Sequence, residues 1–266
     1  MRGTRQAASM LQIKIDQTSP RLPRATTGLL VNAKGGFMRK IMLALAIASL
    51  ATLSWAKDDK QSDTDRLDKA GEVLQQVMAA PDKGIPQEVM DHAKCVAVVP
   101  HMVKGGFVFG AEGGKGVATC RTEHGWSAPA FFTIAGGSWG LQIGVEGIDL
   151  VMVFQTDKGM QHLLESKFKV GADASAAAGP IGRHASANTD WKMNSEILTY
   201  SRAKGVFAGL TLNGADVHPD EDSMRAMYGG DVTFRSVLMG SVPPPPSAHA
   251  FLSAVRGARA EAMAAH

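Results

Sequence analysis

The middle of the chain is a series of short β-type runs separated by glycines. Valine, isoleucine, phenylalanine and other residues typical of strands fill these runs. Glycine-bearing turns between consecutive runs indicate an antiparallel meander rather than strands that alternate with helices. The runs cover residues 95–100, 106–112, 116–121, 130–137, 139–146 and 148–155.

Glycine is also enriched inside the β-type runs. Four of the 29 glycines precede residue 57, so 25 of the remaining 210 residues are glycine, about 12% against a usual 7%. Gly140, Gly144, Gly205 and Gly209 stand within runs, where glycine permits bends, bulges and close backbone approach. We therefore expect a strongly curved, barrel-like antiparallel sheet.

Helical periods flank and interrupt this sheet. A helix is expected over residues 64–80, where Asp63 or Thr64 would cap its start and every third or fourth residue is apolar. Further helices are expected over 86–93, opened by Pro86, over 157–165, capped by Asp157, and over 219–227; further strands are expected over 168–179, 197–203 and 206–213. The predicted fold class is α+β, with N-terminal and inserted helices packed against the curved sheet.

Residues 38–56 have the layout of a secretory signal peptide. A basic start at Arg39 and Lys40 precedes an apolar run over 41–53 and a small-x-small cleavage site at 54–56. The apolar run is shorter than the roughly 20 residues of a spanning helix, and an uncleaved anchor is the alternative. We expect an exported protein, periplasmic or secreted.

The rest of the chain divides around one domain. Translation is expected to start at Met38, which makes residues 1–37 a mis-assigned start or leader extension. Residues 57–240 are expected to form the functional domain, and residues 241–266 a proline-rich spacer with an alanine-rich helical tail.

Net charge argues against a nucleic-acid binder. Residues 1–56 hold 8 of the 28 Lys and Arg residues and 1 of the 25 Asp and Glu residues. The remaining chain has 20 basic and 24 acidic residues, a net charge of about −4. A mildly acidic domain has no general affinity for nucleic acid.

Two short motifs resemble sites of chemistry. Residues 136–140 match the nucleophile elbow G-x-S-x-G with Ser138 as nucleophile, but the elbow needs a helix after it, and a β-turn fits better. Residues 109–116 resemble a phosphate loop but have Gly116 where a magnesium-binding Ser or Thr should stand. We expect a hairpin turn with an exposed Lys115, no catalytic residue and no cofactor.

The two cysteines allow three states. His92, Cys95, Cys120 and His124 are ligand types that suit a tetrahedral zinc site. An exported chain meets an oxidising compartment, where two cysteines on neighbouring strands most simply form a disulfide. The Cys95–Cys120 disulfide is favoured, with zinc binding and two buried thiols as alternatives.

Cations stand in two glycine-rich segments. Arg183 follows the turn of segment 171–184, and Arg202 and Lys204 lie in segment 201–205. This context suits an anionic headgroup or a phosphate. The alternative is that these cations pair with acids on a solvated face.

Seven motifs follow one another along residues 63–240: CVAVVP, GGFVFGAEGGKGVATCR, GWSAPAFFTIAGGSWGLQIGVE, DLVMVF, GADASAAAGPIGR, YSRAKGVFAGLTLNG and Tyr228-Gly229. Their order resembles the SYLF domain, a lipid-binding and yeast actin-binding family, in its bacterial exported form. The resemblance implies a non-enzymatic lipid-binding domain, with phosphoinositides as ligands of eukaryotic members. Some of those members bind actin and carry a separate SH3 or FYVE module.

In eukaryotic members, lipid contact is attributed to an amphipathic N-terminal helix and to basic residues. Here Arg66 and Lys69 of helix 64–80 stand among acids, which makes a poor electrostatic anchor. An apolar face or a groove in the glycine-rich sheet is the better candidate for lipid contact.

The leading functional prediction is an exported protein that binds anionic phospholipid at an envelope membrane. Arg183, Arg202, Lys204 and Lys104 would receive headgroups, and Trp126 or Trp139 would lie at the interface or in the core. Actin is not expected as a partner. The alternatives are a structural envelope protein with protein partners and an exported hydrolase that uses Ser138.

Overall fold

The computed structural model describes residues 60–80, 84–165, 167–181, 195–203, 206–209, 212 and 214–263. All of them belong to one compact unit, Ser49–His266. The expected signal peptide and the expected start at Met38 lie outside the described residues, so both stay predictions.

The first described helix covers residues 60–78. Leu67, Ala70 and Leu74 are fully buried on its inner face, as the helical period predicts. The predicted cap at Asp63 or Thr64 is wrong, because residue 60 is already helical. The Asp63 side chain is instead buried within the helix's packed face, where its Oδ1 lies 3.0 Å from Arg66 Nη2.

Two long strands replace the six short ones predicted. β1 covers Cys95–Thr122 and β3 covers Ala130–Phe154, with the short β2 (Gly125–Trp126) between them. β1 and β3 pair antiparallel along nearly their whole length. The predicted meander is wrong because glycines such as Gly136, opposite Glu112, are paired within the ladder instead of reversing the chain.

β1 nevertheless doubles back on itself. A straight strand of its 28 residues would extend roughly 90 Å, yet the Cα atoms of Cys95 and Cys120 are 4.0 Å apart. Lys104 Nζ lies 3.3 Å from Glu112 Oε2, so residues on either side of position 108 face one another. We call the folded pair of β1 and β3 the doubled ribbon.

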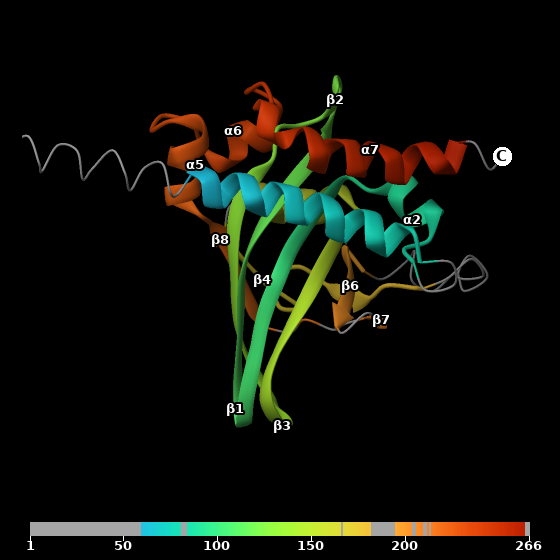
Figure 1. The fold of residues 1–266 in the computed structure, drawn as a ribbon, viewed down its shortest axis with the longest axis vertical. Coiled ribbons are helices and arrows are strands. Elements are labelled where there is room, and N and C mark those ends of the chain that lie inside the picture. Colours follow the sequence, from blue (N-terminus) through green and yellow to red (C-terminus); the bar gives the residue numbers. More distant parts are fainter. Residues whose placement is uncertain are drawn as a thin grey trace, which may run out of the picture. The chain divides into compact units, whose positions relative to one another are not determined.

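The bend of the doubled ribbon coincides with an irregularity in the ladder. Phe107 pairs with Ile143, but Phe109 pairs with Trp139. β3 therefore has three residues in the bend where β1 has one, as the outer strand of a folded ribbon requires. Figure 1 shows the bend at the end where β1 and β3 are labelled, far from the helices.

Glycine lets the two layers of the doubled ribbon approach closely. A Cβ at Gly116 would lie 2.5 Å from the Phe132 ring and 2.8 Å from the carbonyl oxygen of Val98. A Cβ at Gly114 would lie 2.6 Å from Val99 Cγ1. These glycines act through packing and not through turns.

Further strands extend the doubled ribbon on both sides. β6 (Ile197–Ala203) pairs antiparallel with Asp149–Phe154 of β3, and β8 (Ala215–Pro219) pairs antiparallel with Phe132–Ala135. β4 (Phe168–Val170) pairs with β8, β7 (Val206–Gly209) with β6, and β5 (Ala176–Ala178) runs parallel to β6. The sheet is curved, nearly closed and mostly antiparallel, which confirms the predicted fold class.

The shorter helices agree with the predicted ranges within two residues. They are α2 (Gln87–His92), α3 (Asp157–Leu164) and α5 (Glu221–Tyr228). The chain continues with α6 (Phe234–Leu238) and the 3-10 turn η2 (Pro246–Ala248), which were not predicted, and with α7 (His249–Met263) in the alanine-rich tail. The cap of α3 is Thr156 and not Asp157, since the Thr156 hydroxyl accepts a hydrogen bond from the Gly159 amide at 3.0 Å.

Helix 60–78 and α7 lie across the end of the doubled ribbon opposite its bend (Figure 1). A Cβ at Gly71 would lie 3.1 to 3.2 Å from the backbone of Ala250 and Phe251, so the two helices are in close contact. Phe251 and Val255 of α7 are fully buried. No helix in the described ranges is long and apolar enough to span a bilayer.

Candidate functional site

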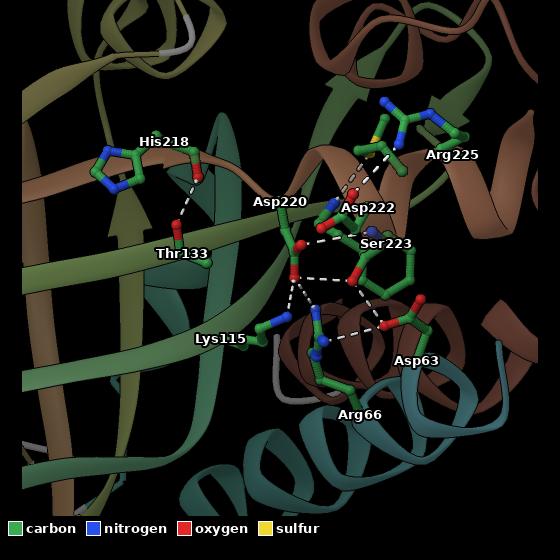
Figure 2. Close-up of polar contacts among 11 residues, drawn as sticks. Asp63, Arg66, Lys115, Thr133, His218, Asp220, Asp222, Ser223 and Arg225 are labelled. Carbon is green, nitrogen blue, oxygen red and sulfur yellow. Dashed lines mark hydrogen bonds and ion pairs between the residues drawn. The ribbon is translucent and has the colours of Figure 1, made fainter. Parts of the chain in front are cut away.

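Five polar side chains from three elements meet beside the sheet (Figure 2): Asp63, Arg66, Lys115, Asp220 and Ser223. We call them the polar cluster. Arg66 Nη1 donates to Asp220 Oδ2 at 3.1 Å, and Lys115 Nζ lies 2.9 Å from the same oxygen. The polar cluster joins helix 60–78, β1 and the start of α5, which are far apart in sequence.

The Ser223 hydroxyl indicates how protons are shared in the polar cluster. Its Oγ lies 2.8 Å from both Asp63 Oδ1 and Asp220 Oδ2, yet a hydroxyl donates only one proton. Burial raises the pKa of Asp63, against the Ser223 hydrogen bond and the charge of Arg66. Burial also acts against the Asp220 carboxylate, but hydrogen bonds and charge from its partners, Lys115 foremost, lower its pKa overall.

Both contacts are satisfied when a protonated Asp63 donates to Ser223 and Ser223 donates to Asp220. The second oxygen of Asp63 is buried with no hydrogen-bond partner among the described residues. An unpartnered oxygen costs less on a neutral carboxyl than on a carboxylate. Burial thus favours the neutral form of Asp63, while the charged and hydrogen-bonding partners of Asp220 favour its ionised form.

A cavity of about 520 Å³ lies beside the polar cluster. Its wall includes Asp63, Arg66 and Lys115, together with Asp222 and Arg225, whose charged groups lie 3.2 Å apart. Each acid around this cavity, Asp220 included, lies within ion-pair distance of a base, so the groups that could attract an ion already have partners. We assign the polar cluster a structural role.

A larger cavity, about 750 Å³, lies at the end of the doubled ribbon that carries β2. We call it the groove, and its volume is within the usual range for small-molecule sites. Its walls are formed by residues 121–124 and 126–128, by residues 238–244 from the end of α6 onward, by Met160 of α3 and by Arg256 of α7. Its apolar lining consists of Trp126, Ala128, Met160, Leu238, Met239, Val242, Pro243 and Pro244.

The charged residues of the groove are mainly basic. The Arg121 guanidinium lies 5.0 Å from the centre of the Trp126 ring, and its Nε donates to the Ala93 carbonyl oxygen at 3.1 Å. His124 and Arg256 are exposed at the rim, and Glu123 is the one acid in the lining. A basic rim beside an apolar wall suits an amphiphile with an anionic head.

The structure describes two of the four predicted headgroup residues, Arg202 and Lys104, and each pairs with a different acid. Arg202 donates to Asp149 Oδ2 through Nε at 3.0 Å and Nη2 at 2.6 Å. Lys104 is paired with Glu112 across the doubled ribbon. Arg183 and Lys204 lie outside the described residues, so a headgroup role for any of the four stays a prediction.

The cysteines form the predicted disulfide between Cys95 and Cys120, and both residues are fully buried. With their sulfur atoms bonded to each other, neither is a thiolate that can hold zinc or a free thiol. His92 and His124 are both exposed, whereas the two cysteines are buried. His92 Nδ1 lies 2.8 Å from the Glu88 carbonyl oxygen. In the described ranges no three metal-ligating side chains are arranged around a common ion position.

Both short motifs lie inside strands. Ser138 pairs with Gly110 in the middle of β3, so the predicted β-turn is wrong, and the strand-to-helix elbow of a hydrolase is not formed. The predicted hairpin turn at 109–116 is also wrong, because this segment belongs to β1. Lys115 is 56% exposed, as predicted, and contacts Asp220.

The polar cluster and the groove were missed at the sequence level. Asp63 and Arg66 are three positions apart, a helical spacing that signals a local ion pair. Their partner Asp220 lies 154 positions from Arg66, and no local pattern marks it. Trp126 was named as an interface residue, but its stacking with Arg121 depends on the path of the chain around β2.

Comparison with known proteins finds one matching family model and similar proteins from mammals and yeast. Residues 135–258 match a family model described as "Ysc84: Las17-binding protein actin regulator". The chain is 34% identical over 170 residues to SH3 domain-containing YSC84-like protein 1 of Rattus norvegicus, covering 63% of this chain and 50% of the relative. It is 34% identical over 194 residues to Protein YSC84 of Saccharomyces cerevisiae, covering 69% of this chain and 41% of the relative. The chain thus spans about half the length, or less, of these relatives.

Proposed function

The chain carries a domain of the Ysc84 family, the SYLF domain, and from this premise we propose that it is a non-enzymatic protein that binds anionic phospholipid at a membrane surface. The observation that carries this proposal is the groove, where basic side chains border an apolar wall. A phosphate group would lie against His124 and Arg256, and the adjoining methylenes against Trp126 and Met239.

Binding without catalysis agrees with what the relatives are named for. The family description refers to Las17 binding and actin regulation, and the relatives' names mention no reaction. The one nucleophile motif of the sequence lies within a continuous strand. These observations support a binding role.

We extend the proposal to location: the protein is exported and acts peripherally at the bacterial envelope membrane, in the periplasm or after secretion. The signal-peptide layout of residues 38–56 supports export. The buried Cys95–Cys120 disulfide is typical of a protein that folds in an oxidising compartment.

A second candidate function is the binding of a protein partner. The family description supports it, since it names Las17 as a protein that members bind. In this chain Pro243 and Pro244 are exposed at the edge of the groove, which gives a partner an accessible extended segment. A partner recovered without co-purifying lipid, together with no vesicle binding, would favour this function.

Vesicle flotation of residues 57–266 tests the lipid proposal, with near-UV circular dichroism as the check on folding. Zwitterionic, anionic and phosphoinositide-containing vesicles are compared at two salt concentrations. We expect binding to anionic vesicles that salt weakens, because exposed charges are screened. No flotation with any composition would refute the proposal.

Charge reversal tests the groove itself. A basic residue near an anionic surface contributes about 1 kcal/mol, so Arg256→Glu should weaken vesicle binding by about tenfold or more. Arg235→Glu is the matched control, because Arg235 is exposed on α6 but does not line the groove. Equal effects of the two variants would remove the groove as the headgroup site.

A further inference from the structure

The bend of the doubled ribbon contributes no residue to the lining of the groove. Figure 1 shows it at the end away from helix 60–78 and α7. Neighbouring strands stop before they reach it: β6 pairs with β3 only over Asp149–Phe154, and β8 only over Phe132–Ala135. We define the ribbon tip as residues 105–111 and 137–145.

Apolar side chains at and next to the ribbon tip are open to solvent. Val145 is 80% exposed and Val103 is 44% exposed. In the ladder Val103 pairs with Gly147 and Val145 pairs with Gly105, so the two valines are diagonal neighbours on one face. Glycine opposite each of them adds no side chain that would cover it.

The sequence of the ribbon tip contains no charged residue. It reads GGFVFGA over 105–111 and GSWGLQIGV over 137–145, with Ser138 and Gln142 as its polar side chains. Charges begin directly at its border, with Lys104 opposite Glu146 in the ladder and Glu112 paired with Lys104 across the bend. An uncharged, aromatic-containing end bordered by charges is the pattern of a segment that enters a membrane interface.

We propose that the ribbon tip inserts into the outer part of a lipid bilayer, between the headgroups and the first acyl methylenes. The proposal rests on the proposed membrane function but not on the groove. Backbone pairing between β1 and β3 satisfies the inner edges of the inserted ribbon. Its outer edges have no neighbouring strand in the described sheet, which limits insertion to the depth that water and headgroups still reach.

An environment-sensitive fluorophore tests the insertion. The label is attached in the full chain to a cysteine introduced by Val145→Cys, while Cys95 and Cys120 stay in their buried disulfide. Ile181→Cys gives the matched control, because Ile181 is 41% exposed and lies outside the doubled ribbon of β1 and β3. Both labelled proteins contain residues 38–56, so any binding through that segment is common to them.

Insertion predicts that the fluorescence emission of the label at position 145 shifts to shorter wavelength when phosphatidylglycerol-containing vesicles are added. It also predicts that nitroxides attached to the lipid chains near the headgroups quench this fluorescence. The label at position 181 should show neither. If vesicles float the protein but both labels respond alike, the insertion is refuted while the proposed function stands. If the protein floats with no vesicle composition, the proposed membrane function is refuted, and the insertion that rests on it is refuted with it. A blue shift without lipid that grows with protein concentration would refute insertion in favour of contact between two copies.

Paired substitutions give a second measurement. Val103→Asp with Val145→Asp places two charges at the membrane interface and should lower vesicle affinity by about tenfold or more, with the remaining binding still sensitive to salt. Ile181→Asp should leave the affinity within about twofold of the parent. Because both valines are exposed, the double variant should keep the parent's near-UV spectrum, and an unchanged affinity in a folded double variant would overturn the proposal.

Discussion

Cys95 and Cys120 stand near opposite ends of a single β-strand, and a disulfide joins them. The bond holds β1 in its doubled-back path, so that its first residues pack against its last. The groove lies at this end of the doubled ribbon, and the ribbon tip lies at the other. One covalent contact therefore stabilises the scaffold that carries both proposed lipid sites.

Removal of this disulfide should destabilise the protein. For a loop of 25 residues, the chain-entropy model gives about 3.5 kcal/mol of lost stability for Cys95→Ala with Cys120→Ala. Urea unfolding monitored by circular dichroism measures this loss. The parent protein unfolded with and without reductant is the control, and equal stability under both conditions would show that the bond adds nothing.

Gly116→Ala should disturb the contact between the two layers of the doubled ribbon. Its Cβ would overlap the Phe132 ring and the Val98 carbonyl oxygen, and overpacking of this kind costs about 1 to 3 kcal/mol. Gly137→Ala is the matched control, since the nearest atom to its Cβ would be 3.9 Å away. Similar thermal midpoints for the two variants would argue against close packing at Gly116.

Arg66→Met should be among the most destabilising single substitutions. It leaves the buried Asp63 and Asp220 carboxyls without the guanidinium that bridges them, a loss of about 3 to 5 kcal/mol. Chemical denaturation at neutral pH measures the loss. The exposed Arg225→Met is the control, and it should change stability by less than about 1 kcal/mol. Arg66→Met with parental stability would contradict a bridging role.

The two aspartates should affect stability with opposite dependence on pH. The pKa of Asp63 is raised in the folded protein, so folding binds a proton there, and this contribution is lost as pH rises through the folded pKa. The pKa of Asp220 is lowered, so its contribution is present above the ordinary value of 3.8 and is lost as pH falls through the folded pKa.

Asp63→Asn and Asp220→Asn test these signs. As pH rises from 3.8, the free energy of unfolding of the parent should fall relative to Asp63→Asn. Below pH 3.8 the comparison with Asp220→Asn should have the opposite slope. There the free energy of unfolding of the parent should increase relative to that of Asp220→Asn as the pH increases toward 3.8. Urea unfolding across the acidic range measures both differences, and slopes of the same sign would contradict the proposed sharing of protons through Ser223.

Arg202→Gln should act on stability more than on vesicle binding. Its guanidinium is held by two hydrogen bonds to Asp149, and the loss of a half-buried charged hydrogen bond costs about 1.5 to 3 kcal/mol. Arg256→Gln should show the reverse order, because Arg256 is exposed at the rim of the groove. A larger loss of vesicle affinity in Arg202→Gln would support the predicted headgroup role of Arg202.

Local patterns in the sequence were enough to predict the kinds of element. The spacing of Leu67, Ala70 and Leu74 predicted a helix with one buried face, because a helix returns to the same face every 3.6 residues. The β-type residues from Cys95 onward predicted strands, and the abundance of glycine predicted strong curvature. The disulfide was the favoured one of three states, because an exported chain meets an oxidising compartment and both cysteines stand on predicted neighbouring strands, and the structure confirms it.

The tertiary structure alone decided where the chain bends and which charges meet. A glycine permits a turn and a close packing contact equally, so the sequence predicts turns at 109–116 and 136–140, whereas Gly116 and Gly136 lie inside the paired strands. Ion pairs form between side chains that folding brings together, so Arg66 could not be matched to Asp220, 154 positions away, from local periodicity. The groove and the ribbon tip exist for the same reason, since each depends on how one long two-stranded ribbon folds back on itself.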